Sequence, residues 1–573
     1  MQNLETGRLW THEKGLVRLA MPFRQLLRST PHNMLLSLLA TAGALSYAVE
    51  VLDPPSCSAD CLIDSDIKTL LRSGDPIGLT WALKDNSSAT KNDWIGFYAP
   101  PFAQGDYSGH DYFMWIDVSA LHTNKHIVHL TNMRADYYDI RYMRGYDCLC
   151  RAPQVKFEMG VYEPTQGHAS IEHTTGVLQI QWVSGGPPSI GYLQYRTGID
   201  EDWMTLNASV THYTLENMCG VDKRNYYDPG YFYNVTLPLK SSSVEVRFGS
   251  AKGMSKTFVV QPGIPEGVSD GVHSIALYGD MGVQGYSLGP DKVEVGRWGW
   301  NSYWVQDHLA CNPRLRLLTH IGDISYAVGN SRVWDMFGQA VQELSLKRPL
   351  VASIGNHEFD YSSGGWHPSW GNFGSDSGGE CGIPTKHRYK FPNWWYSFSF
   401  GIVRYFMLSS EHDWTEGSEQ WKWLNEELSK VNRSITPWVI VTSHRPMIVS
   451  AYGSSEDPVE EQLRLAMLPL FKKHKVDLFV GGHWHHYERS DPIDGTVHVI
   501  AGSAGAKDET VYPYRDLPTV PVKWPWVRGY LELQVSRENM TGIFWGINDS
   551  MADRRLIQID NFIVVSKVGE SNS

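Results

Sequence analysis

Five short apolar runs in the second half of the chain constrain its fold most strongly. They are HSIALYGD (273–280), RLLTHIGD (316–323), RPLVASIGN (348–356), PWVIVTSH (437–444) and VDLFVGGH (476–483). Each has the length and composition of a buried strand, and each ends in Asp, Asn or His, in most cases next to a glycine. Helix-like segments with apolar residues three and four apart stand between them, as in residues 419–431 and 460–474. This alternation predicts a largely parallel sheet covered by helices.

The polar residues at the ends of these runs are expected to meet, because ligand sites in such folds lie just beyond the carboxyl ends of the strands. The strand ends supply seven oxygen and nitrogen donors and no thiolate: Asp280, Asp323, Tyr326, Asn356, His444, His483 and His485. This donor set suits hard or borderline cations better than a structural zinc ion. A carboxylate can bridge two cations, and such a pair can bind a phosphate and lower the pKa of water. The sequence therefore predicts a two-metal site.

Three of the histidines stand close together in VDLFVGGHWHHYERS (476–490). If the chain stays extended beyond the glycines, side chains alternate between two faces. His483 and His485 would then share one pocket, while Trp484 and His486 would point the other way. Neutral imidazole is a common metal ligand. For this segment alone, a polar loop with solvated or core-bonded histidines is the alternative.

Tyr326 indicates which cation the site would hold. A phenol has a reference pKa near 10. It becomes a ligand at neutral or acidic pH only beside a strongly Lewis-acidic ion, of which Fe(III) is the usual case. The tyrosine therefore favours iron.

Five motifs occur in a fixed order: GDMG (279–282), GDISY (322–326), GNHE (355–358), VTSH (441–444) and GHWH (482–485). In these motifs the chain resembles the purple acid phosphatases, a family within the dinuclear metallophosphoesterases. The wider superfamily opens with Asp-x-His, whereas Gly282 holds the third position here. GDISY supplies the tyrosine that purple acid phosphatases use instead. DWIGFYAPP, MCG (218–220) and YYDPGYFYNVTL also look like the N-terminal domains of the large plant-type enzymes that carry an extra N-terminal β-domain.

The resemblance implies a role for each donor. Fe(III) would be held by Asp280, Tyr326 and His485. A divalent metal (Zn, Mn or Fe) would be held by Asn356, His444 and His483, with Asp323 as the bridge. His357 lies where the family places a histidine near the phosphate and leaving group, which makes it the candidate catalytic acid; a structural histidine that bonds a ligand is the alternative. His486 and the following YER would contact the ligands rather than the metals.

The function implied is a secreted acid phosphatase, in which a metal-bound hydroxide attacks the phosphorus of a phosphate monoester. A phosphodiesterase or nucleotide pyrophosphatase on the same metal pair is the first alternative, and an inactive cell-surface binding protein is the second. One departure leaves the general acid open between His357 and metal-bound water. The segment after the fourth motif, HRPMIVSAYGSSEDPVEE (444–461), lacks the further histidines of well-known plant members. Arg445 is the nearest cationic donor there, with a salt bridge as its alternative role.

A chain of 573 residues requires several domains. Residues 1–48 read as a leader and signal peptide, with the apolar run MLLSLLATAGALSYA at 34–48. Strand-like runs predict an antiparallel β-sandwich at 49–165 and a second one at 166–262. The resemblance implies that the second is fibronectin-III-like and that the α/β metallophosphoesterase domain follows at 270–573. The two β-domains could serve packing, formation of a homodimer or substrate access, and the sequence leaves these roles open.

Several features agree with a secreted protein, or one in the vacuolar or lysosomal lumen. Six N-x-[ST] sequons occur, at Asn86, Asn207, Asn234, Asn432, Asn539 and Asn548. Of seven cysteines, Cys148 and Cys150 are expected to pair with the Cys57/Cys61 segment rather than bind metal, and a Cys311–Cys381 pair is left open. The net charge of −12 argues against nucleic acid as a partner. A small phosphorylated substrate is expected, and no membrane in the mature form.

Two aromatic or glycine-rich segments follow the third motif. FPNWWYSFSFG (391–401) is predicted to be core rather than a base-stacking platform. The long Gly/Ser/Trp-rich loop at 357–382 is predicted to be a rim or lid on the leaving-group side, with a merely flexible insertion as the alternative.

Overall fold

The computed structural model describes residues 57–567, except 71, 85–87, 101–111, 119–120, 122, 174–175, 187–189, 224, 239–242, 270, 284–301, 361–365, 372, 507–511 and 549–554. The predicted leader at 1–48 and the sequon at Asn86 lie outside the described residues. Within them, no helix is both long and apolar enough to cross a membrane.

Two antiparallel sheets form the predicted first β-sandwich. One sheet contains, in order, β1 (Cys61–Ser65), β3 (Pro76–Leu83) and β6 (Lys125–His129). The other contains, in order, β5 (Tyr112–Asp117), β4 (Asp93–Tyr98), β7 (Asp139–Arg144) and β8 (Asp147–Arg151). A short parallel pair joins β2 (Thr69–Leu70) to β9 (Lys156–Phe157). Leu79, Phe97 and Tyr142 are fully buried in the core.

The disulfides follow the prediction for the N-terminal cysteines. Cys57 pairs with Cys148, and Cys61 pairs with Cys150. The third disulfide joins Cys219 to Cys381, so the Cys311–Cys381 pair does not form. Cys311 is exposed and stays outside the disulfides, as the odd number of cysteines requires.

Two further antiparallel sheets form the second β-sandwich. The first is ordered β10 (Thr165–Ile171), β11 (Leu178–Ser184), β15 (Tyr231–Thr236) and β14 (Ser209–Thr211). The second is ordered β13 (Met204–Asn207), β12 (Tyr192–Arg196), β16 (Val244–Ser250) and β17 (Gly253–Met254), with β18 (Phe258–Val260) also on β16. Trp182 stacks between Tyr233 and Phe248 in its core, with ring centroids 5.3 and 5.2 Å away.

The remaining strands form two mixed sheets, where the sequence predicted sheets of largely parallel strands flanked by helices. One sheet is ordered β21 (Leu350–Ser353), β20 (Leu315–Ile321), β19 (His273–Tyr278), β29 (Val527–Val535), β30 (Asn539–Asn548) and β31 (Ile557–Val565). The other is ordered β22 (Tyr396–Phe400), β23 (Val403–Met407), β24 (Trp438–Ser443), β25 (Leu478–Gly481), β27 (Val497–Ala501), β26 (Tyr487–Arg489) and β28 (Val522–Trp524). The five predicted runs are parallel within their sheets. Antiparallel neighbours extend both sheets: β29, β30 and β31 in the first, and β22, β26 and β28 in the second.

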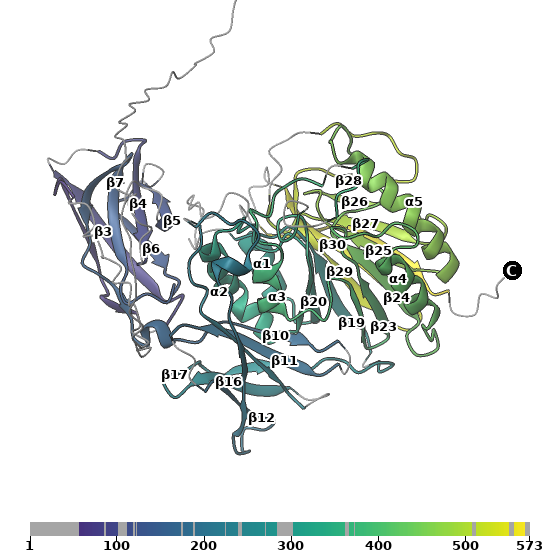
Figure 1. Ribbon diagram of the computed structural model, residues 1–573, viewed down its shortest axis with the longest axis horizontal. Coiled ribbons are helices and arrows are strands. Elements are labelled where there is room, and N and C mark those ends of the chain that lie inside the picture. The colour runs from purple at the N-terminus through teal and green to yellow at the C-terminus, as the bar shows by residue number, and fades with distance from the viewer. Residues whose placement is uncertain are drawn as a thin grey trace, which may run out of the picture. The chain divides into compact units, whose positions relative to one another are not determined.

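Helices cover the outer faces of these two sheets, which face each other across a shared core (Figure 1). The first sheet carries α1 (Ser302–Cys311), α2 (Ser331–Lys347) and α3 (Ile383–Tyr389). The second carries the two predicted helices, α4 (Glu419–Ser429) and α5 (Asp457–His474). Leu424 of α4 and Phe471 of α5 pack on Val439 and Phe479. The predicted α/β class is thus confirmed.

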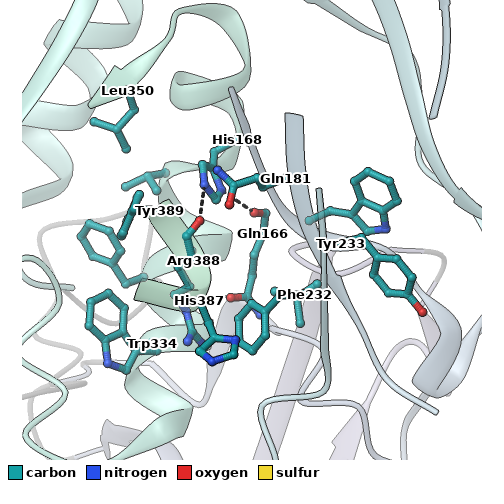
Figure 2. Close-up of a pocket in the computed structure, with 15 residues that line it drawn as sticks. Gln166, His168, Gln181, Phe232, Tyr233, Trp334, Leu350, His387, Arg388 and Tyr389 are labelled. Atoms are coloured by element: carbon teal, nitrogen blue, oxygen red, sulfur yellow. Dashed lines mark hydrogen bonds between the residues drawn. The ribbon is translucent and has the colours of Figure 1, made fainter. Parts of the chain in front are cut away.

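A pocket lies where the second β-sandwich packs against helices of the α/β region (Figure 2). Strands β10, β11 and β15 line one side of it, and helices α2 and α3 line the other. His168 lines it, and its Nε2 lies 2.9 Å from the Arg388 carbonyl oxygen. Burial lowers the pKa of His168 to about 4, so the ring is neutral. The Arg388 guanidinium is within 3.4 Å of the Asp335 carboxylate. The pocket is thus lined by a neutral histidine and a charge-compensated arginine, and none of the seven predicted metal-site donors lies on its walls.

The aromatic segment at 391–401 is mainly core, as predicted. Phe398 and Phe400 of β22 are fully buried, whereas Trp394 and Trp395 are half-buried. His412 stacks on Trp394 with ring centroids 5.6 Å apart.

Candidate metal centre

The turns after five strands position the seven predicted donors. The first sheet contributes Asp280 after β19, Asp323 and Tyr326 after β20, and Asn356 after β21. The second contributes His444 after β24, and His483 and His485 after β25. Most are fully buried, and they gather in two neighbouring clusters. The predicted convergence of the strand ends is therefore present, at the junction of two sheets rather than the edge of one.

Several donors sit on backbone that turns sharply. Asp280, Asp323, Tyr326 and His483 have φ angles of 60°, 49°, 55° and 70°. This left-handed conformation is unfavourable for residues with a side chain, so the surrounding structure must hold it in place. Glu358 does so for the Asp323 turn: its carboxylate accepts hydrogen bonds from Asp323 N (2.8 Å), Ile324 N (2.8 Å) and Gly355 N (3.0 Å).

The first cluster contains acceptor atoms that face each other. His444 Nε2 lies 3.2 Å from Asp323 Oδ2 and 3.0 Å from Asn356 Oδ1, and His483 Nδ1 lies 3.1 Å from the same amide oxygen. The Ile321 carbonyl, 2.9 Å from His444 Nδ1, can only accept, so that nitrogen carries the proton and Nε2 offers a lone pair.

The Asn356 amide is oriented in the same sense. Its Nδ2 donates to Asp376 Oδ2 at 3.1 Å, which turns Oδ1 toward the two histidines. Lone pairs of the imidazoles, the amide and the Asp323 carboxylate thus converge on one small volume. Such an arrangement is repulsive unless a cation or a proton lies between the atoms, so this donor set fits a metal ion.

The second cluster is built around Tyr326. Its Oη lies 3.1 Å from Asp280 Oδ1 and 2.8 Å from His485 Nε2, which is itself 3.3 Å from Asp280 Oδ1. Ligand atoms of Asp280, Asp323 and His485 lie within 4.8 Å of one another, as do those of Asp323, His444 and His483. Asp323 is common to both clusters, which is the place that a bridging ligand must take.

The charges of the protein chain alone also call for a cation. Burial opposes ionisation of Asp323, but the charges of His444 and His357 hold the pKa of its carboxyl far below the usual range. Burial likewise disfavours protonated His444, yet the Asp323 and Asp280 carboxylates raise the pKa of His444 to about 10. Without a metal, the pocket therefore holds a proton as its positive charge.

His357 lies beside both clusters. Its backbone N donates to Asp323 Oδ1 at 3.0 Å, and its Nε2 is 3.9 Å from Asp323 Oδ2. The imidazole packs on the Tyr326 ring with centroids 4.4 Å apart, and 14% of its side chain is exposed. Its exposed edge is compatible with contact to a ligand above the metals.

Arg445 is held in a salt-bridge network. Its side chain is fully buried, and Nε lies 2.9 Å from Glu411 Oε1. Nη1 contacts Glu456, and Nη2 donates to the Phe373 carbonyl at 3.0 Å. Of its two predicted roles, the structure favours the salt bridge over phosphate binding.

The segment 482–486 is not extended, contrary to the prediction. Trp484 N bonds Gly482 O at 2.8 Å and His486 N bonds Trp484 O at 2.7 Å, and these bonds across two residues fold the chain into tight turns. His483 and His485 still face the metal centre, but they belong to different clusters. His486 lies 3.2 Å from Glu488 Oε1 rather than against a ligand atom.

Sequence reasoning missed three acidic residues that orient the ligands: Glu358, Asp376 and Glu456. Glu358 is the last residue of the GNHE motif, and a carboxylate within a metal-site motif could have indicated a residue that orients the ligands. Asp376 and Glu456 come from segments distant in sequence from the donors they contact, so no spacing rule identifies them.

Comparisons with known proteins agree with this geometry. Residues 273–487 match the family model of the calcineurin-like phosphoesterases. A barley (Hordeum vulgare) nucleotide pyrophosphatase/phosphodiesterase is 36% identical over 40% of this chain and 68% of its own length. "Probable inactive purple acid phosphatase 9" of Arabidopsis thaliana is 25% identical over 84% of this chain and 83% of its own. "Probable inactive purple acid phosphatase 27" of the same plant is 32% identical, and the chain spans about half of that relative's length (53%).

The fold has a solved counterpart. A purple acid phosphatase from yellow lupin (Lupinus luteus) seeds superposes with a TM-score of 0.73, covering 88% of this chain and 96% of that one at 22% identity. Fold, donors and family match define a metallophosphoesterase of the calcineurin-like class. Within that class, the chain belongs to the purple acid phosphatase family, in a large plant-type form with an N-terminal β-domain.

Proposed function

We propose that this protein is a secreted acid phosphatase that hydrolyses phosphate monoesters at a dinuclear Fe(III)–M(II) centre. The observation that carries the proposal is the pair of acceptor clusters that share Asp323. Fe(III) belongs with Asp280, Tyr326 and His485, because a phenol ligand requires a strong Lewis acid. The divalent ion, Zn, Mn or Fe, belongs with Asn356, His444 and His483. When bound, the pair supplies Lewis acidity and lowers the pKa of water.

The residues of the chain position and protonate the substrate around that pair. His357 is the candidate proton donor to the leaving alkoxide, since it lies beside Tyr326 and keeps an exposed edge. The segment 366–382 forms the rim on the leaving-group side, and Asp376 connects it to Asn356. A small phosphorylated molecule, rather than nucleic acid, is the expected substrate of this acidic protein.

The absorption spectrum of the purified protein tests the proposal. We expect a visible charge-transfer band that is lost in Tyr326→Phe, because only a tyrosinate bound to Fe(III) produces it. Elemental analysis should find iron together with a divalent metal. If the protein is colourless but still hydrolyses phosphate esters, the hydrolase activity stands, and another metal takes the place proposed for iron.

A phosphodiesterase or nucleotide pyrophosphatase is the second candidate, and the name of the barley relative favours it. Initial rates on a monoester, a diester and a nucleotide diphosphate-sugar, measured at one pH and one metal loading, separate the two. A kcat/KM for the monoester above those of the other substrates supports the leading proposal.

An inactive cell-surface binding protein is the remaining alternative, and the names of the Arabidopsis relatives bear only on its inactivity. The presence of all seven donors argues for activity in this chain. A purified protein that binds no metal and hydrolyses none of the three substrates would establish the inactive alternative.

Secretion, or residence in the vacuolar or lysosomal lumen, is supported by three disulfides, which form in oxidising compartments. The sequon residues Asn207, Asn432 and Asn539 are exposed, which suits glycosylation. We also propose that the mature protein is not bound to a membrane. A homodimer is one proposed oligomeric state, which light scattering tests.

A further inference from the structure

Glu456 lies against the face of His483 that is turned away from the metal cluster. His483 Nδ1 faces Asn356 Oδ1 at 3.1 Å, and its Nε2 lies 2.8 Å from Glu456 Oε2. Both side chains are largely buried, with 14% and 19% of their surfaces exposed. Nδ1 thus faces the cluster, whereas Nε2 faces the carboxylate behind it, with Arg445 Nη1 farther away at 3.3 Å.

The carboxylate fixes which nitrogen of His483 carries the proton. Oε2 accepts from the Arg445 guanidinium and is the nearer partner of Nε2, so we assign the hydrogen on Nε2 to this contact, and Nδ1 is left with its lone pair directed into the cluster. Without such a partner the imidazole could exchange tautomers or rotate. His444 is fixed in the complementary sense, because its Nδ1 donates a hydrogen bond to the Ile321 carbonyl and Nε2 faces the cluster.

Glu456 is itself held in place from two directions. It immediately precedes α5, so its backbone position depends on that helix. Its carboxylate also contacts the buried Arg445 guanidinium, which is anchored by Glu411 and by the Phe373 carbonyl. The Arg445 guanidinium lies against the Glu456 carboxylate and compensates its charge in this buried setting.

We infer that Glu456 is a positioning residue for the divalent site: it sets the tautomer and orientation of His483 and thereby the affinity of that site for its metal. This inference rests on the proposed two-metal function. Removal of such a partner typically weakens metal binding about 10- to 100-fold. The tyrosine-containing site should be unaffected, because Glu456 contacts none of its donors in the described structure.

The test measures metal binding rather than turnover. Protein that retains its iron but has been freed of divalent metal is titrated with Zn²⁺ at buffered free concentrations, and the visible band is recorded in parallel. Glu456→Leu removes the acceptor, whereas Glu456→Gln keeps an acceptor oxygen for Nε2 and Arg445 but removes the charge. Glu460→Gln is the matched control, because that buried carboxyl lies at the same end of α5 and bonds Trp484 instead of a ligand.

We expect the Zn²⁺ affinity to fall about 100-fold in Glu456→Leu and about tenfold in Glu456→Gln, with the visible band unchanged in both and the control like wild type. Unchanged Zn²⁺ affinity in Glu456→Leu would overturn the inference. Equal loss of iron and zinc in Glu456→Gln would also overturn it, since the effect would then be general unfolding. A wild-type protein that binds neither metal would instead refute the proposed function itself.

Discussion

Gly355 lies where a side chain cannot be accommodated. A Cβ at this position would stand 2.2 Å from Asp323 Oδ1 and 2.8 Å from His444 Cδ2, far inside contact distance. The atoms in the way belong to Asp323 and His444, which are both predicted metal-site donors. Gly355 of the GNHE motif therefore allows two turns that carry metal-site donors to approach each other closely.

Gly355→Ala should displace Asp323 and His444 while leaving the sheets intact. We expect kcat/KM to fall about 100-fold, since a displacement of about 1 Å at a reacting centre costs that much. Steady-state kinetics and metal analysis measure the effect. Gly198→Ala is the control, because its Cβ would meet nothing closer than 3.5 Å. Equal activity of the two variants would contradict the packing argument.

At the scale of single residues, the metal-site donors could be predicted from the sequence, because the residue types at the strand ends restrict which metals can bind there. Tyr326 and the pair His483 and His485 are examples. The supporting residues could not, since Asp376 and Glu456 act through contacts between distant segments. The role of Arg445 also stayed open until its two carboxylate partners were known.

At the scale of secondary-structure elements, Glu380 joins α2 to the turn that carries Tyr326. Its carboxyl accepts hydrogen bonds from Trp334 Nε1, near the start of α2, and from Gly329 N. Burial raises the pKa of Glu380 from 4.5 to about 7. In the folded protein this group thus remains protonated over a pH range in which the unfolded chain has ionised.

Glu380 should therefore make the protein less stable as the pH rises from about 4.5 to 7. Over that range the unfolded state binds fewer protons than the folded state, so the free energy of unfolding falls with pH. Compared with Glu380→Gln, wild type should lose about 3 kcal/mol across this window and nothing further above it. Urea denaturation at a series of pH values measures the difference. The exposed Glu158→Gln should show no such trend, and a pH-independent difference for Glu380→Gln would contradict the assignment.

The five strands and helices α4 and α5 were predictable from hydrophobic periodicity, which is a local property. Two features were not. The antiparallel addition of β29 to β19 joins segments far apart in the chain. The turns at 482–486 depend on hydrogen bonds across two residues, which no apolar pattern records.

For the molecule as a whole, α2 connects the second β-sandwich to the metal-bearing sheets. Leu346, near the end of α2, is fully buried in the sandwich core beside residues such as Trp182 and Phe248. Val341, one and a half turns earlier, is buried in the core of the sheets. One helix thus contributes to two hydrophobic cores.

Leu346→Ala should weaken both regions together. Removing this buried side chain should cost about 2–5 kcal/mol in the free energy of unfolding. Because the two cores share a helix, near-UV circular dichroism and loss of the visible band should report one transition at lower urea. Leu465→Ala, at a half-exposed position of α5, is the control. Separate transitions in wild type would show that the cores unfold independently.

The order of β-rich and α/β regions was predictable from composition and strand spacing. The division of the catalytic strands into two facing sheets was not, because it depends on how strands from distant segments pair.

That division has a consequence for how the protein is made. Each metal cluster takes donors from both sheets, and β19, which leads to Asp280, lies between β20 and the late strand β29. During synthesis, neither metal can be held until the ribosome has released almost the whole catalytic region and the sheets have met. In the proposed function, metal insertion would then be a late step of maturation, and a coloured protein would indicate that both sheets had formed and met.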